Sequence, residues 1–152
     1  MTLRVRSPIP GRVLPLREIA DPGFAQGMVG PGVALDPERA IGAAVAPVTG
    51  TVVMLHPHAF VVATADGAAV LVHLGIDTVT LGGEDFFTPH VTQGQTVRTG
   101  QQVISWDPAA VQAGGRSPLC PVIALDATAA HPLWCHRPGP IAIGDPLFDW
   151  RH

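Results

Sequence analysis

Three histidines in two neighbouring segments are the residues of this chain best suited to chemistry. His56 and His58 are two positions apart, and His73 follows a mainly apolar stretch. A neutral imidazole is a nucleophile near neutral pH, and a phosphoryl group carried on it stays reactive toward a second acceptor. A second imidazole beside it can donate a hydrogen bond to the phosphoryl oxygens and stabilise the charge that develops there. These residues therefore favour phosphoryl carriage on one histidine with support from another, which needs no cofactor and no resident metal.

The same residues leave two other hypotheses open. His56, His58, His73 and Asp77 together supply three nitrogens and a carboxylate, which is an acceptable ligand set for a zinc-dependent hydrolase. Pro57 makes the geometry of that set doubtful, because proline lacks an amide donor and suggests that the strand begins only near His58. In the other hypothesis the histidines tune an apolar docking surface of a non-catalytic regulatory module.

A β-hairpin is the element that must bring the two segments together. Residues 61–64 and 68–72 are apolar runs typical of strands, and Asp66-Gly67 between them favours a tight two-residue turn. In that register Phe60 lies opposite His73. His58 is then a diagonal neighbour of His73 on the same face, at about 7–8 Å between Cα atoms.

The hairpin has two unlike faces in this register. We expect one to be buried against a second sheet and the other to carry the imidazoles. The first holds Ala59, Val61, Ala63, Val70, Val72 and Leu74, and the second holds His58, Phe60, Val62, Leu71 and His73. We expect His56 to point into solvent.

Composition favours an all-β fold. The chain has 152 residues, enough for one domain with its own core, and its 17 glycines and 16 prolines favour many short strands joined by turns. One short helix is predicted from Asp107 to about Ala113, with Asp107 as N-cap and Pro108 at the first helical position.

Charge and residue usage exclude several functions. The net charge of −3 and the scattered basic residues leave no basic stripe for nucleic acid. All nine basic residues are arginine, which excludes biotin or lipoyl attachment and Schiff-base chemistry on lysine. There is no signal-like segment and no apolar run that could insert into a membrane, so we expect a cytoplasmic protein. Cys120 and Cys135 are expected to be free thiols.

These motifs resemble the glucose-type IIA component of the bacterial phosphoenolpyruvate-dependent sugar phosphotransferase system. The resemblance runs from about Ser7 to Trp150. It rests on Val45-Ala46-Pro47-Val48-Thr49-Gly50-Thr51-Val52, His58-Ala59-Phe60, Val72-His73-Leu74-Gly75-Ile76-Asp77-Thr78-Val79, Gly94-Gln95-Thr96-Val97 and Gly144-Asp145-Pro146-Leu147.

The resemblance implies a fold and a phosphocarrier function. The implied fold is an antiparallel β-sandwich of two sheets, of the duplicated hybrid motif type, with one or two short helices, and residues 1–152 would form a single IIA domain. His73 would accept a phosphoryl group from phospho-HPr, with His58 as the supporting histidine. The group would pass to the IIB domain of a sugar permease of the glucose or N-acetylglucosamine class.

The resemblance also implies a docking face. It would be apolar with an acidic rim, which would steer a basic partner in a salt-dependent way. Its candidate contacts are Val62, Leu71 and Val79, with Asp77 as the candidate rim carboxylate. Some relatives also have regulatory target proteins, a further class of possible partner.

Overall fold

Short apolar runs separated by glycine and proline form antiparallel strands throughout the computed structural model, which describes residues 2–25, 30–78, 86–125 and 132–151. The strands are β1 (Thr2–Arg6), β2 (Gly11–Leu14), β3 (Gly32–Pro37), β4 (Gly42–Val45), β5 (Gly50–His56), β6 (Ala59–Ala63), β7 (Ala69–His73), β8 (Phe87–Pro89), β9 (Thr96–Val97), β10 (Gln102–Trp106), β11 (Cys120–Leu125), β12 (Trp134–Cys135), β13 (Gly139–Ile141) and β14 (Pro146–Arg151). The helical segments are η1 (Leu16–Glu18), α1 (Pro22–Ala25) and α3 (Pro108–Ala113).

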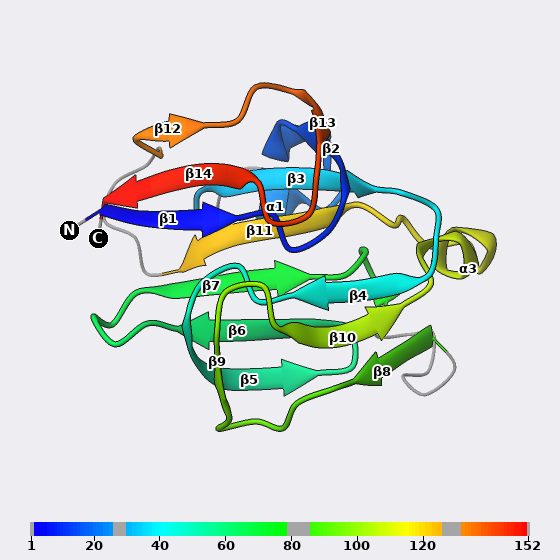
Figure 1. The fold of residues 1–152 in the computed structure, drawn as a ribbon. Helices are drawn as coiled ribbons and strands as arrows, with labels where there is room; N and C mark the ends of the chain where they lie inside the picture. Colours follow the sequence, from blue (N-terminus) through cyan, green and yellow to red (C-terminus); the bar gives the residue numbers. More distant parts are fainter. Residues whose placement is uncertain (1, 26–29, 79–85, 126–131, 152) are drawn as a thin grey trace.

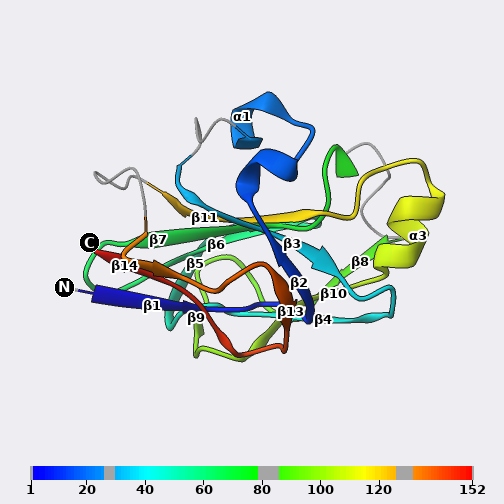
Figure 2. The same cartoon turned by 90° about the horizontal axis from the view of Figure 1, so that it is seen from above.

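The strands form two layers, which confirms the predicted antiparallel sandwich. One layer is an eight-stranded sheet in the order β13-β2-β3-β11-β7-β6-β5-β9. The other consists of two three-stranded sheets, β1-β14-β12 and β4-β10-β8 (Figure 1). Seen from above, η1 and α1 lie on the outer side of the large sheet, away from β1 and β14 (Figure 2). The outer face of the large sheet is therefore partly covered by these two helical segments.

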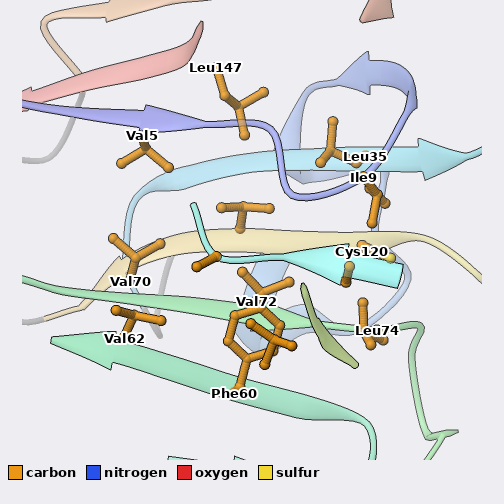
Figure 3. Packing of buried hydrophobic residues seen from close by; sticks show 14 of the residues in the cluster. Val5, Ile9, Leu35, Phe60, Val62, Val70, Val72, Leu74, Cys120 and Leu147 are labelled. Atoms are coloured by element: carbon orange, nitrogen blue, oxygen red, sulfur yellow. The ribbon is translucent and has the colours of Figure 1, made fainter. Parts of the chain in front are cut away.

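The main core lies between the layers. Figure 3 shows Phe60, Val72 and Leu74 of the hairpin region among side chains from both layers, including Val5 and Leu147. All five are fully shielded from solvent. Full burial of such a side chain contributes about 1.5–3 kcal/mol, so the hairpin is firmly held to the sandwich through its inner face.

The predicted helix is confirmed as α3. Asp107 precedes it, and its Oδ1 accepts a hydrogen bond of 3.1 Å from the amide of Ala110, as an N-cap does. Pro108 occupies the first turn, where its missing N–H costs nothing. No helix in the described part of the chain is long and apolar enough to cross a lipid bilayer.

The hairpin turn differs from the prediction by one residue. The amide of Thr64 donates to the carbonyl of Ala68 at 2.8 Å, and the amide of Gly67 donates to the carbonyl of Thr64 at 3.0 Å. These bonds close a three-residue loop in which Gly67 takes the left-handed position, with a φ of +89°. The prediction of a two-residue turn is wrong, because a three-residue loop also uses Asp-Gly with glycine as its last residue.

The shifted register changes which residues of β6 face the core. Ala59 pairs with His73, and Phe60 pairs with Val72. Phe60 and Val62 belong to the main core, whereas Ala59 and Val61 pack with Leu71 on the outer face. The predicted faces were therefore correct for β7 and wrong for β6, as expected when a register slips by one residue.

Candidate active site

His73 is the last residue of β7 and is half-buried on the outer face of the large sheet. Its Nδ1 lies 2.6 Å from the carbonyl oxygen of Gly75. Because a carbonyl oxygen can only accept, the neutral ring donates its Nδ1 hydrogen to Gly75. The lone pair of the neutral imidazole is then on Nε2, which makes Nε2 the nucleophilic atom.

The loop that follows β7 places this carbonyl. Gly75 has a φ of +81°, and a Cβ at this position would lie 2.9 Å from the carbonyl oxygen of Ser117. The amide of Ile76 donates to that same oxygen at 2.9 Å, which ties the loop to the segment before β11. The buried hydroxyl of Thr78 donates to the carbonyl of Leu74 at 2.9 Å. The sequence Leu-Gly-Ile-Asp-Thr thus forms a tight, internally bonded loop that fixes the acceptor for His73.

His58 lies in the two-residue turn between β5 and β6 rather than in a strand. Its carbonyl accepts a 2.7 Å hydrogen bond from the amide of Leu74, which connects the turn to the end of β7. Its ring centroid is 5.0 Å from that of His73, with the ring planes at 68°. The predicted proximity of His58 and His73 is confirmed, but it comes from the turn and not from diagonal neighbours on paired strands.

Burial keeps both imidazoles neutral. It lowers the pKa of His58 from 6.5 to about 4, with smaller contributions from the positive charge that His73 and His56 acquire on protonation. Burial also lowers the pKa of His73, although the hydrogen bond to Gly75 and the charges of Asp21 and Asp77 oppose this. At neutral pH the site therefore holds two neutral rings, the form in which a histidine attacks an electrophile.

Phe24 of α1 also contacts His73. Its ring centroid is 5.5 Å from that of His73, with the planes at 59°. Phe24 also packs against the outer-face cluster that includes Leu71. Phe24 was not predicted as a site residue, because a short proline- and glycine-rich segment carries no periodic signal that would place its phenylalanine over a sheet.

His56 is exposed, as predicted, but it also contacts the site. Its ring is stacked on that of His58, with centroids 5.9 Å apart and planes at 11°. The structure thus brings three imidazoles into one cluster, with His58 in contact with each of the other two.

Comparisons with known proteins show the family to which the chain belongs. Residues 3–130 match the family described as phosphoenolpyruvate-dependent sugar phosphotransferase system, EIIA 1. The chain belongs to this EIIA family. A glucose-specific EIIA component from Oceanobacillus iheyensis is 41% identical over 123 residues, covering 80% of this chain and 73% of that protein. The solved structure of glucose permease IIA from Mycoplasma capricolum matches with a TM-score of 0.90 at 31% identity, covering 99% of this chain and 97% of that one.

Some relatives are much longer than this chain. A glucose-specific EIICBA component from Streptococcus pneumoniae is 40% identical over 144 residues, which cover 93% of this chain but only 19% of that protein. The EIIA chain therefore corresponds to one part of such a multidomain relative. As a family member, it is a phosphotransferase component that carries a phosphoryl group for sugar uptake.

The predicted docking residues of this EIIA chain fall into three groups. Leu71 lies on the outer face beside the site and is 8% exposed, and Asp77 is exposed at the loop after β7. Val62 is fully buried in the core, so its prediction as a surface contact is wrong. The cause is the pairing of β6 with β7, which is shifted by one residue from the predicted register. Val79 lies outside the described residues.

The zinc hypothesis finds little support in the EIIA site. Within the described ranges, no three side chains of the His, Cys, Asp and Glu types are grouped to hold a metal ion. The backbone of Asp77 lies in the left-handed region, with a φ of +58°. Membership of the EIIA family favours the phosphocarrier over the hydrolase.

Proposed function

We propose that His73 is the phosphoryl acceptor of this EIIA chain, that His58 supports the transfer, and that the donor and acceptor proteins are phospho-HPr and the IIB domain of a sugar permease. The observation that carries the assignment is the 2.6 Å contact between His73 Nδ1 and the carbonyl of Gly75. It leaves Nε2 as the free nucleophilic atom next to a second imidazole 5.0 Å away.

The chemistry consists of two displacements at phosphorus. In the first, the Nε2 lone pair of His73 forms a bond to phosphorus while the phosphorus–nitrogen bond of the donor histidine breaks and returns its electron pair to that ring. In the second, a thiolate of the IIB domain attacks the phosphorus, and the bond to Nε2 breaks. His73 ends as the neutral imidazole from which it began.

His58 changes its role when the phosphoryl group arrives. A phosphoryl group carries about −1.5 to −2 charges near pH 7, and this charge favours a proton on the neighbouring imidazole. A protonated His58 donates a charge-assisted hydrogen bond to a phosphoryl oxygen. The low pKa of His58 in the unphosphorylated protein keeps the site uncharged until then.

Docking of HPr is proposed to use the outer face around His73. Phe24 borders the site with partly exposed apolar surface and packs with Leu71, which is itself only 8% exposed, and the exposed carboxylate of Asp77 lies on the loop after β7. An exposed carboxylate steers a basic partner and speeds association at low salt. The partner permease is proposed to be of the glucose or N-acetylglucosamine class. One relative, from Oceanobacillus iheyensis, is named glucose-specific, and another, from Dickeya chrysanthemi, is named beta-glucoside-specific.

The first experiment is phosphorylation with phosphoenolpyruvate, enzyme I and HPr, followed by intact-mass spectrometry. The wild type and the control His90→Ala are expected to gain one acid-labile phosphoryl group, and His73→Ala is expected to gain none. His90 is a matched control because it is exposed and follows β8 in the opposite layer. Phosphorylation of His73→Ala would assign the acceptor to another residue and refute the proposal.

The second experiment separates the two histidines. His58→Gln keeps His73 and is expected to accept the phosphoryl group from HPr. Its rate of transfer to the IIB domain is expected to be about 100-fold lower than that of the wild type. Onward transfer at the wild-type rate would remove His58 from the mechanism.

The third experiment tests the acidic rim. Asp77→Asn removes the charge, and asparagine also tolerates the positive φ of this position. We expect weaker binding of HPr at low salt and a difference that shrinks as salt is added. An affinity for HPr that is unchanged at every salt concentration would contradict the steering role.

A further inference from the structure

Register places His56 and His73 in one lateral row across three strands. His56 of β5 pairs with Ala59 of β6, and Ala59 pairs with His73 of β7. Directly paired residues in a sheet project from the same face. The two histidines therefore flank the small, buried side chain of Ala59 on the outer face of the large sheet.

An irregularity in β5 is what turns His56 to this face. Val52 pairs with Val62, and Met54 pairs with Val61, so Val53 has no partner of its own in the ladder. Val52 belongs to the main core, whereas Met54 packs on the outer face, although regular alternation would keep both on one side. The bulge at Val53 thus reverses the alternation and brings His56 to the outer face.

The imidazole of His58 connects the two ends of this row. It contacts His56 by parallel stacking at 5.9 Å and His73 by an edge contact at 5.0 Å. The backbone of His58 is held by the hydrogen bond that its carbonyl accepts from the amide of Leu74, and the φ of the preceding Pro57 is restricted. Among the described residues the His58 ring makes no hydrogen bond, so its orientation rests on the two ring contacts.

We propose that His56 is a positioning residue for phosphoryl transfer, because its stacked ring holds the imidazole of His58 in the edge contact with His73. The proposal rests on the assignment of His73 and His58 given under the proposed function. His56 itself is exposed and does not contact His73 in the structure, so it acts on the reaction only through His58.

Stacking and charge are two different ways in which His56 could act, and two variants separate them. His56→Phe keeps a flat ring that can stack, at the offset distance of about 4.5–7 Å that aromatic pairs prefer, but it cannot carry a proton. His56→Ala removes both the ring and the charge. If the ring alone is needed, phenylalanine restores what alanine loses.

The charged and titratable surroundings of the cluster stay constant between these two variants. His58 faces His73 of β7 and His56 of β5, and His73 faces Asp21 from the segment before α1 and Asp77 from the loop after β7. Neither His56→Phe nor His56→Ala has a titratable group at position 56, so a difference between them reports the ring.

The experiment combines NMR spectroscopy of the unphosphorylated protein with rapid-mixing measurements of phosphoryl transfer to the IIB domain. In His56→Ala we expect loss of the nuclear Overhauser contact between the rings of His58 and His73 and transfer slowed about tenfold, since misplacement of about 1 Å can cost up to 100-fold. In His56→Phe and in the control His90→Ala we expect the contact and the rate to match the wild type within about twofold.

Three results would overturn the proposal. One is an unchanged ring contact or an unchanged transfer rate in His56→Ala. Another is a His56→Phe variant as impaired as His56→Ala, which would assign the effect to the proton. The last is loss of the ring contact in the control. Failure of the proposed function is recognised separately, because it would appear as phosphorylation of His73→Ala, and the ring contact is measured without any phosphoryl group.

Discussion

Substitution of Gly75 by alanine tests how the loop after β7 holds His73. Gly75 has a φ of +81°, in the left-handed region, where a side chain costs about 1–2 kcal/mol. The new Cβ would also lie 2.5 Å from Cγ2 of Thr78 and 2.9 Å from the carbonyl oxygen of Ser117. Crowding of this kind in a packed region adds about 1–3 kcal/mol. We therefore expect Gly75→Ala to lower the free energy of unfolding by about 2–5 kcal/mol.

Gly67 provides the matched control. Its φ is +89°, close to that of Gly75, but nothing lies within 4 Å of a Cβ built there. Gly67→Ala is therefore expected to lower the free energy of unfolding only by the cost of a side chain at a positive φ, about 1–2 kcal/mol. The difference between the two variants isolates the crowding against Ser117 and Thr78.

Denaturant and thermal unfolding measure the two losses. For a chain of this length, 1 kcal/mol corresponds to about 2–4 °C in Tm, so the extra crowding predicts a separation of about 2–12 °C between the variants. In Gly75→Ala, NMR is also expected to show His73 losing its fixed Nδ1–H tautomer, because the acceptor carbonyl shifts. Equal stability losses with an unchanged His73 tautomer would refute the account of this loop.

Three further predictions concern the same site. Burial lowers the pKa of His58 to about 4, so between about pH 6.5 and pH 4 the unfolded chain binds the proton that the folded chain excludes. The free energy of unfolding is therefore highest above about pH 6.5 and falls by about 1–2 kcal/mol, after allowance for solvent screening, as the pH drops to about 4. Denaturant unfolding measures this decline, and a His58→Gln variant with the same pH profile as the wild type would contradict the prediction. Thr78→Val leaves the carbonyl of Leu74 without its 2.9 Å donor and is expected to cost about 1–3 kcal/mol, whereas Thr78→Ser costs less, as measured by thermal unfolding. Phe24→Ala exposes the ring of His73, and since burial is the main cause of its low pKa, NMR titration is expected to show that pKa rising, with a smaller rise in Phe24→Leu.

The all-β class was predictable because the strands are short, apolar and separated by turn residues, whereas the two-sheet sandwich was implied by the resemblance to the IIA family. The helix at α3 was predictable for a similar reason, since an aspartate followed by proline is a local signal that needs no tertiary information. The contact between His58 and His73 was also predicted correctly. Its derivation was wrong, because Asp66-Gly67 fits both a two-residue and a three-residue loop.

Other features of the site depend on contacts that the sequence does not encode locally. The burial of Val62 follows from the register, and the register is set by one residue in the turn. The contact of Phe24 with His73 depends on how a short helix docks on the outer face of a distant strand. The stacking of His56 depends on a bulge at Val53, in a stretch of apolar residues where no glycine or proline marks it.

The cluster of imidazoles owes its geometry to two single-residue irregularities that act together. The extra residue in β5 turns His56 outward, and the extra residue in the β6–β7 loop places Ala59, rather than Phe60, opposite His73. In the two-residue register a phenylalanine would face His73 from the neighbouring strand, where the structure has the small side chain of Ala59. Side chains alternate with a period of two along a strand. Either irregularity alone would therefore put His56 and His73 on opposite faces of the sheet. The outward cluster therefore requires both, and a change in loop length at either position is expected to disrupt the site before it disrupts the core.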